Sequence, residues 1–291
     1  MKILVLGKGG QLGNCLVDQF FYTNHEVIFF DRLDLDICDF LATSEKICDI
    51  KPDIVINATA YTAVDDAESN KVLADQVNNL AVENLAKTCL LLNAWLIHIS
   101  TDYVFDGALS RPYLESDPTN PSTAYGVSKL KGELAIDSSG CKYLIIRTAW
   151  VFSEYGGNFL KTMLRLGAER DELSIVCDQI GCPTYAQDLA RSIISIIPFL
   201  SLKKTCSGVF HYCGDQTCSW FDFAKAIFKE AELRGIKIPN TVSSINTSAY
   251  PTPATRPPYS VLDCSHIKNT FKLLQSDWRL GIQRSLDKLN N

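Results

Sequence analysis

The chain has 291 residues, of which 46% are hydrophobic and 21% charged, and its net charge is −5. This apolar content excludes a mainly disordered chain, because disordered chains have too few apolar side chains to bury. An acidic chain is poorly suited to nucleic acid, whose phosphates require a basic face. No apolar run reaches the roughly 18 residues of a membrane helix, and the N-terminus shows no signal-peptide pattern. We therefore expect a cytoplasmic protein with no membrane or nucleic-acid partner.

Eleven cysteines and four histidines are scattered along the chain, without a Cys-x-x-Cys pair. A disulfide scaffold is typical of short secreted chains, and zinc sites have closely spaced ligands. The pattern favours free thiols in a reducing cytosol, and we expect no metal site.

Short apolar runs alternate with helical patterns through the first two thirds of the chain. Strands are expected at residues 2–6, 26–30, 53–57, 95–100, 143–147 and 173–177, with helices at 12–22, 72–93 and 124–137. Apolar runs without alternation suit strands that are buried on both faces, as in a parallel sheet covered by helices. The sequence predicts an α/β fold, a doubly wound parallel Rossmann sheet with a smaller C-terminal α/β substrate domain.

The pattern changes after about residue 200. One more strand is expected at 208–213 and a helix at 220–234, followed by a loop at 248–258 that contains four prolines, Tyr250 and Arg256. Proline lacks the N–H that a sheet interior needs, so this segment is either a substrate loop or a connector. The predicted nucleotide-binding domain comprises residues 1–150 with about 172–200, and the substrate-binding domain about 151–171 and 214–291.

A glycine-rich turn follows the first expected strand directly. Glycines at 7, 10 and 13 have the spacing G-x-x-G-x-x-G, and a helical pattern begins at Leu12. Such glycines permit a tight turn, the approach of backbone amides to a pyrophosphate, and close packing of the helix on the strand. The helix N-terminus then offers free N–H groups to the phosphates. The turn predicts a bound dinucleotide, with Gly7, Gly10 and Gly13 in its binding loop.

The second expected strand ends in Asp31, at about the distance where an acid binds the ribose hydroxyls of NAD. Arg32 beside it is suited to the additional phosphate of NADP. The sequence leaves both cofactors open, and we expect NADPH or NADH. Further cofactor contacts are expected near later strand ends, at Asp36, Ile37, Ala58 and Ala60.

Tyr125 and Lys129 are four residues apart in an expected helix, so both side chains lie on one helix face. A phenol, with a pKa of about 10, is a poor acid at neutral pH, and a neighbouring ammonium lowers that pKa. Thr101 follows the strand at 95–100, at the end where a doubly wound sheet binds its ligands. Thr101, Tyr125 and Lys129 therefore form a candidate catalytic set for hydride chemistry at a carbonyl group.

These features resemble the extended short-chain dehydrogenase/reductase superfamily. Five further blocks narrow the resemblance to the dTDP-4-dehydrorhamnose reductase family: residues 57–65, 100–105, 147–151, 179–184 and 247–257. With Trp278-x-x-Gly281 they extend over essentially the whole chain. The family implies NAD(P)H-dependent reduction of the C4 keto group of dTDP-6-deoxy-L-lyxo-4-hexulose to dTDP-L-rhamnose. This is the last step of dTDP-rhamnose biosynthesis, which supplies lipopolysaccharide and cell-wall polysaccharides.

By the same resemblance, Tyr125 gives a proton to the C4 oxygen, Lys129 holds the nicotinamide ribose and tunes Tyr125, and Thr101 orients the keto oxygen. Residues expected beside the pyrophosphate are Gly10, Gln11 and Leu12, and those expected further along the cofactor are Ala60, Tyr61 and Thr62. The sugar is expected to face Thr101, Asp102 and Trp150. Arg256 in the proline-rich loop is a candidate for the diphosphate of the sugar nucleotide.

Some members of this family form dimers bridged by a metal ion that glutamates hold. At the matching positions this chain has Cys15, Gln187 and Lys288. A hard divalent cation prefers carboxylate oxygens, and a lysine ammonium repels it. We therefore expect no magnesium-bridged dimer, while a homodimer of another kind stays open.

Three other functions stay open. A nucleotide-sugar epimerase or dehydratase shares the fold, but the dehydratases carry an acid directly after the Thr-Asp pair, where this chain has Tyr103. A reductase that makes a related dTDP sugar, of the dihydrostreptose type, would differ only in pocket shape. A non-catalytic regulatory subunit, like that of methionine adenosyltransferase, would bind the cofactor without a reaction. The complete set of Thr101, Tyr125 and Lys129 argues for catalysis.

Overall fold

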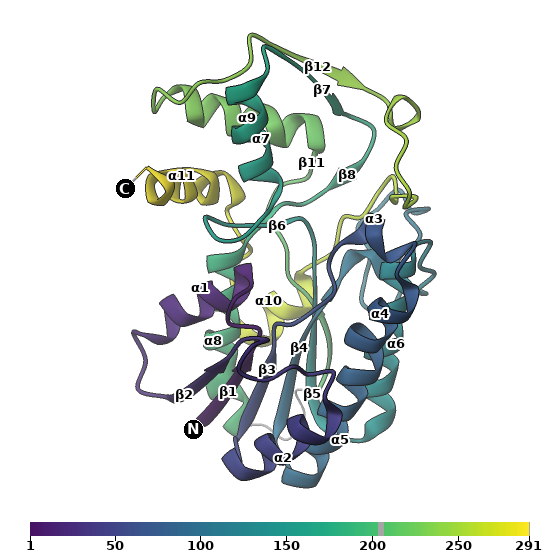
Figure 1. Ribbon diagram of the computed structural model, residues 1–291, viewed down its shortest axis with the longest axis vertical. Coiled ribbons are helices and arrows are strands. Elements are labelled where there is room, and N and C mark those ends of the chain that lie inside the picture. Colours follow the sequence, from purple (N-terminus) through teal and green to yellow (C-terminus); the bar gives the residue numbers. More distant parts are fainter. Residues whose placement is uncertain (203–206, 291) are drawn as a thin grey trace.

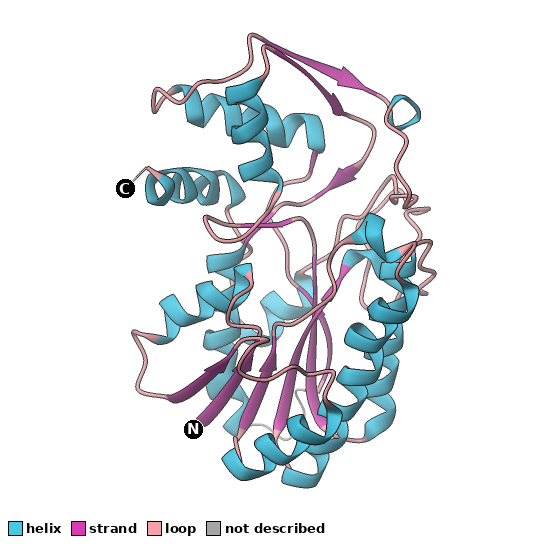
Figure 2. Ribbon diagram, viewed as in Figure 1, coloured by secondary structure: helices cyan, strands magenta, loops and turns pink. Residues whose placement is uncertain are grey.

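The computed structural model describes residues 1–202 and 207–290. Its largest sheet has the order β10-β5-β4-β3-β1-β2, and every neighbouring pair is parallel (Figures 1 and 2). The strands are β1 (Lys2–Leu6), β2 (Glu26–Phe30), β3 (Ile54–Asn57), β4 (Trp95–Thr101), β5 (Lys142–Thr148) and β10 (Gly208–His211). The predicted doubly wound α/β fold is confirmed.

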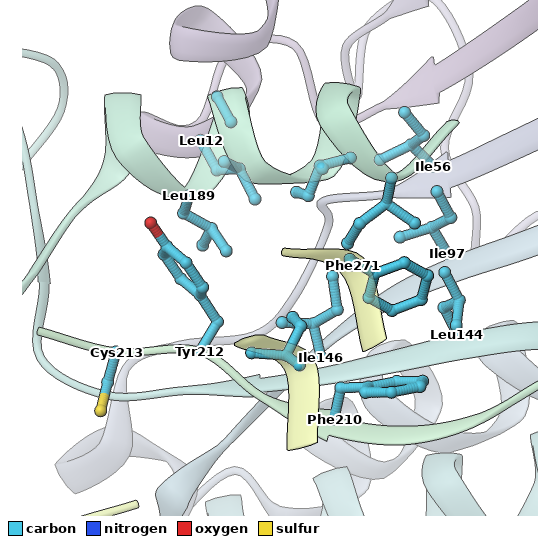
Figure 3. Close-up of a cluster of buried hydrophobic side chains, with 14 of the residues drawn as sticks. Leu12, Ile56, Ile97, Leu144, Ile146, Leu189, Phe210, Tyr212, Cys213 and Phe271 are labelled. Carbon is cyan, nitrogen blue, oxygen red and sulfur yellow. The ribbon is translucent and has the colours of Figure 1, made fainter. Parts of the chain in front are cut away.

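The central strands are apolar on both faces because helices cover both sides of the sheet. Ile3 and Val5 of β1 belong to a core with α1 (Gln11–Phe20), α8 (Ala186–Leu202) and α10 (Ser265–Phe271). Leu4 and Leu6 belong to the opposite core with α2 (Phe40–Ile50) and α5 (Ala81–Leu92). Figure 3 shows the first core, in which Leu189 of α8 lies over the sheet beside Leu12. Two apolar layers thus hold the carboxyl ends of the strands in fixed positions.

The helix expected at 72–93 is divided. It comprises the α4 helix (Lys71–Asp75), a π-helical turn (Gln76–Leu80) and α5. Inside that turn, Asn78 is buried and its side chain bonds the backbone N–H and carbonyl of Tyr61, at 2.9 and 3.0 Å. Its amide also donates to the Ser128 hydroxyl. Such turns frequently occur at functional sites, and this one ties the chain after β3 to the helix that carries Tyr125.

A second unit lies beyond the carboxyl ends of the six strands (Figure 1). Its helices are α7 (Phe159–Glu169), α9 (Trp220–Glu232) and α11 (Trp278–Leu289), and their shared core contains Phe223 and Trp278. Three two-stranded sheets complete it: β6 (Val151–Phe152) with β9 (Thr184–Tyr185), β8 (Ile180–Gly181) with β11 (Cys218–Ser219), and β7 (Glu172–Val176) with β12 (Thr241–Ile245).

One expectation about the sheets is wrong. The strand at 173–177, assigned from the sequence to the nucleotide-binding sheet, is β7 and pairs with β12 in the second unit. β10 instead takes the place beside β5. The segment 214–291 is also not confined to the expected substrate domain, because its helix α10 packs against β10 and α8. The last residue of this segment lies outside the described part. The remaining domain boundaries stay predictions.

Within the described ranges, no helix is long and apolar enough to cross a membrane. The cytoplasmic location stays a prediction from the sequence.

Candidate active site

A cleft of about 540 Å³ opens at the carboxyl ends of the central strands. The strand order reverses between β1 and β3, and open α/β sheets bind their ligands at such a point. Twelve of the predicted site residues line the cleft: Gly10, Gln11, Leu12, Ala58, Ala60, Thr62, Thr101, Asp102, Tyr125, Lys129, Trp150 and Arg256. The structure therefore brings the expected cofactor, catalytic and sugar-facing groups together.

The glycine turn has the geometry of a pyrophosphate cradle. Gly7 has a φ of +93°, and a Cβ at Gly13 would lie 2.0 Å from the carbonyl oxygen of Gly7, so α1 packs directly on the turn. Gly10 precedes α1, and neither a side-chain cap nor an acidic residue occupies the first helical turn. The free N–H groups of this first helical turn and the positive end of the helix dipole thus suit an anion. The residues fit a dinucleotide cofactor. Gly7 and Gly13 do not line the cleft, but they determine the shape of the turn.

Five expected cofactor residues also lie outside the lining: Asp31, Arg32, Asp36, Ile37 and Tyr61. Asp31 stands beside Gly9 of the turn, and its carboxylate accepts the backbone N–H groups of Leu33 and Asp34 at 2.8 and 3.1 Å. Arg32 pairs with Asp36 at 3.1 Å on the exposed surface. Ile37 is buried in the core beside α2. The roles of these residues toward a cofactor stay predictions.

Tyr125 is placed by the start of α6 (Ala124–Ser139). The Thr123 hydroxyl caps this helix by accepting the N–H of Gly126. A Cβ at Gly126 would lie 2.2 Å from the carbonyl oxygen of Tyr103, so the helix packs directly on the turn after β4 and Tyr125 comes beside Thr101. Burial raises the pKa of Tyr125, and a hydrogen bond with Thr101 partly opposes this. Tyr125 is therefore a protonated phenol that faces the cleft.

Lys129 is 1% exposed, one helical turn after Tyr125. Its Nζ lies 2.6 Å from the carbonyl oxygen of Ile99 and 3.0 Å from Nε2 of His98. Burial lowers the pKa of Lys129 to about 8, against the opposing charge of Glu133. His98 could not be predicted from the sequence, because a single histidine in an apolar strand gives no sign of its partner.

Asp102 is almost fully buried at the bottom of the cleft. Its Oδ1 accepts the Thr101 hydroxyl at 3.0 Å, whereas its Oδ2 has no hydrogen-bond partner among the described residues. Burial raises the pKa of Asp102 to about 6, although the neighbouring hydroxyls of Ser260 and Thr101 oppose the shift. A buried acceptor without a partner is costly, and a sugar hydroxyl would satisfy it.

Trp150 forms one wall of the cleft. Its φ of 49° is unusual for a large residue, and its ring stacks on Trp220 with centroids 3.5 Å apart and planes 9° apart. A Cβ at Gly181 would lie 2.5 Å from the Trp150 ring, so this glycine makes room for the indole. Trp220 could not be predicted as a cleft residue, since nothing in the sequence pairs a residue of α9 with Trp150.

The proline-rich loop closes one side of the cleft. Arg256 Nη2 lies 2.7 Å from Asp65 Oδ2, and the backbone N–H of Ala254 donates to the same carboxylate. A second cavity of about 690 Å³ lies between α7, β7 and this loop, and Trp220 and Arg256 border both cavities. The loop therefore lies against two cavities, and its role as a substrate loop or a plain connector stays a prediction.

At two of the three positions where this chain lacks a metal-binding glutamate, Gln187 and Lys288, the side chain contacts two carboxylates. Lys288 Nζ lies 2.6 Å from Glu154 Oε1 and 3.2 Å from Asp18 Oδ2. Gln187 donates to the same two carboxylates, at 3.1 and 2.6 Å. An ammonium thus stands between the carboxylates of α1 and of the loop after β6. The expectation of no magnesium-bridged dimer stays a prediction.

A parallel Rossmann sheet, a glycine turn and a Thr/Tyr/Lys set in one cleft define an extended short-chain dehydrogenase/reductase. The family model described as "RmlD substrate binding domain" matches residues 1–291. The chain belongs to the dTDP-4-dehydrorhamnose reductase family. It is 41% identical to the dTDP-4-dehydrorhamnose reductase of Escherichia coli K12, over 99% of this chain and 98% of that protein.

Solved structures agree with this assignment. The Clostridium acetobutylicum dTDP-4-dehydrorhamnose reductase superimposes with a TM-score of 0.92 and 40% identity, over 100% of both chains. The Bacillus anthracis enzyme, solved in complex with NADP, gives 0.91 and 36% over 99% of both.

Proposed function

We propose that this chain reduces the C4 keto group of dTDP-4-dehydro-6-deoxy-L-mannose to form dTDP-L-rhamnose, with NADPH or NADH as reductant. The observation that carries the proposal is the placement of Thr101, Tyr125 and Lys129 in the same cleft as the glycine turn. Membership of the family and the NADP complex of its B. anthracis member support the choice of reaction and cofactor.

The reduced nicotinamide supplies the hydride when it is bound. This chain's own residues do the rest. The N–H groups of Gln11 and Leu12 at the start of α1 would hold the pyrophosphate, because the Gly10 N–H already donates to the Gly7 carbonyl at 3.0 Å. Tyr125 gives its proton to the C4 oxygen as negative charge develops there. Thr101, which bonds both Asp102 and Tyr125, orients the phenol.

The substrate is proposed to extend across both cavities. The sugar would lie between the unpartnered Oδ2 of Asp102 and the Trp150 indole, which supplies an apolar wall. Arg256 borders both cavities and would bind the diphosphate through its guanidinium. The thymidine would then enter the second cavity, whose lining is mostly apolar, with Phe159, Met163 and Leu173 among its residues.

The dehydratase alternative is disfavoured by Tyr103. Burial raises its pKa to about 12, partly opposed by Arg256, so it is a poor base for removing a carbon-bound proton. The dihydrostreptose-type reductase differs only in the product, which the test at the end of the Discussion identifies.

The proton-donor role is tested with Tyr125→Phe. If Tyr125 is the general acid, this variant lowers kcat by roughly 10²-fold or more while cofactor binding is kept. Tyr143→Phe is the matched control. Tyr143 lies near the start of β5, at the end of the strand away from the cleft, and its hydroxyl donates to Asp137. Nicotinamide oxidation with the keto sugar is followed for both variants. Near-normal turnover by Tyr125→Phe would exclude this role.

A further inference from the structure

His98 and Asn57 stand behind the catalytic lysine, and both are fully buried. They are register partners on β4 and β3, and Asn57 Nδ2 lies 3.1 Å from His98 Nδ1. On the other side of the ring, His98 Nε2 lies 3.0 Å from Lys129 Nζ. The three side chains form one hydrogen-bonded chain that ends at Lys129.

The first member of this chain has a fixed direction. Asn57 Oδ1 accepts the backbone N–H of Thr59 at 3.0 Å and the Thr59 hydroxyl at 2.5 Å. A backbone N–H can only donate, so the amide oxygen of Asn57 has to face Thr59 and its NH₂ has to face His98. Turning the amide over would bring its NH₂ against the Thr59 N–H.

The direction of Asn57 decides where His98 carries its proton. An NH₂ that faces Nδ1 requires Nδ1 to accept, and a neutral imidazole then has its proton on Nε2. Burial holds the pKa of His98 well below its usual value, so the ring is neutral. The Nε2–H therefore points at Lys129 Nζ. An ammonium there would set two donors face to face, whereas an amine offers a lone pair.

We propose that His98 is a positioning residue which, together with Asn57, favours the uncharged amine form of Lys129 over the ammonium in the cofactor-free enzyme. An N–H of that amine donates to the Ile99 carbonyl. The consequence for catalysis rests on the proposed function of Tyr125. An amine stabilises a phenolate less than an ammonium does, so Tyr125 keeps its proton in the enzyme that has not yet bound its cofactor.

The surrounding charges agree with this assignment. The groups that face Lys129 are His98 and the Ile99 carbonyl on β4, and Tyr125 and Glu133 on its own helix. The Glu133 carboxylate is itself bonded by Arg147 of β5, at 2.6 Å, and by the Ser100 hydroxyl. Its charge is thus already compensated, and burial of Lys129 favours the amine.

The position of the imidazole proton can be measured directly. Protein labelled with ¹⁵N-histidine is examined without cofactor, at about pH 8.5, by two-bond ¹H–¹⁵N correlation, which distinguishes the two tautomers; His98→Gln assigns the signal. We expect the proton of His98 on Nε2. His211 is the internal control: it is equally buried, but its Nδ1 faces the Tyr113 carbonyl oxygen at 3.1 Å, so its proton belongs on Nδ1. A proton on Nδ1 of His98 would overturn the inference.

Asn57→Asp should exchange the donor and acceptor roles along the three hydrogen-bonded side chains, because the two residues have nearly the same shape. A carboxylate has no N–H, so it would accept from Thr59 on one oxygen and from His98 Nδ1–H on the other. His98 Nε2 would then accept from a Lys129 ammonium. We expect the His98 signals to take the pattern of His211. We also expect the titration midpoint of Lys129, followed with ¹³Cε-lysine, to rise by about one pH unit or more.

An unchanged tautomer and midpoint in Asn57→Asp would contradict the inference. If that variant does not fold, the wild-type tautomer alone decides. Because both spectra are recorded on free protein, their outcome is independent of whether any substrate turns over. Failure of the proposed function would instead appear as absent turnover, so the two failures are distinguishable.

Discussion

At the scale of single residues, Asp102 is a buried carboxylate in the cleft whose charge opposes stability. Its carboxylate is buried, and its Oδ2 has no partner among the described residues. Burial raises its pKa from 3.8 to about 6. A group with a raised pKa contributes stability below its unfolded-state pKa, and that contribution is lost as the pH rises through the folded-state pKa. Asp102 therefore destabilises the protein above about pH 6, where it is ionised.

Asp102→Asn is expected to separate stability from turnover. At pH 8 the variant should be more stable than the wild type by roughly 1–3 kcal/mol, because no charge is buried. The difference should vanish on acidification from pH 6 to pH 4. Turnover should fall, since the amide offers NH₂ where the sugar hydroxyl needs an acceptor. Urea unfolding at the two pH values and steady-state kinetics measure both. A variant less stable than wild type at pH 8 would contradict the assignment.

At the scale of elements, the glycine turn joins β1 to α1 with no space for side chains. Gly7 is next to the backbone of Ala58 and Thr59, at the end of β3, and Gly13 is against the Gly7 carbonyl. The turn is also bonded to β2, because the N–H groups of Gly7 and Lys8 donate to the Phe30 carbonyl. Three strand ends and one helix N-terminus are thus held together at the predicted pyrophosphate site.

Gly13→Ala is expected to weaken cofactor binding by at least tenfold, because a Cβ 2.0 Å from the Gly7 oxygen forces α1 away from the turn. Gly9→Ala is the control in the same turn: its Cβ would meet only the Cβ of Asp31, at 3.9 Å. Fluorescence titration with NADPH and NADH gives both dissociation constants. Equal affinities in the two variants would show that the turn does not shape the cofactor site.

Elements that depend on local pattern could be predicted from the sequence. The strands at 2–6 and 26–30 and the start of the helix at Ala124 need only local apolar runs and caps. Partners distant in sequence could not be predicted. β7 has an apolar run that suits either sheet, and its partner β12 is too polar and exposed to give a strand signal. Asn57 and His98 meet through the register of β3 and β4, which no local pattern specifies.

At the scale of the whole molecule, charged contacts join the second unit to the large sheet behind the cleft. Lys288 of α11 bonds Asp18 of α1 and Glu154 of the loop after β6. In the same region Gln11 of the glycine turn accepts from Ser153 and Asn158, at 3.1 and 2.9 Å. The contacts that join the two units therefore include a residue of the expected pyrophosphate site.

Lys288→Met is expected to lower the free energy of unfolding at pH 7 by about 1–2 kcal/mol. The expected loss is smaller than for a fully buried ion pair because the ammonium is half-exposed. Although burial opposes it, hydrogen bonds from Tyr155, Gln187 and Lys288 hold the pKa of Asp18 below 3.8. Its stabilisation is present above that value and is lost as the pH falls through the folded-state pKa. The difference from wild type should therefore shrink below about pH 4.

Urea unfolding at pH 7, 5 and 3.5 measures this dependence, with the exposed Lys237→Met as control. A difference that grows on acidification would contradict the assignment of the contacts of Lys288.

The most direct test of the reductase assignment is turnover of its proposed substrate. Enzymatically prepared dTDP-4-dehydro-6-deoxy-L-mannose is mixed with the protein and with NADPH or NADH, nicotinamide absorbance is followed, and the product sugar is identified by NMR. The expected result is oxidation of the cofactor matched by formation of dTDP-L-rhamnose. Formation of a different sugar would contradict the assigned product, and cofactor binding without any turnover would contradict the assignment of Thr101, Tyr125 and Lys129 as a catalytic set.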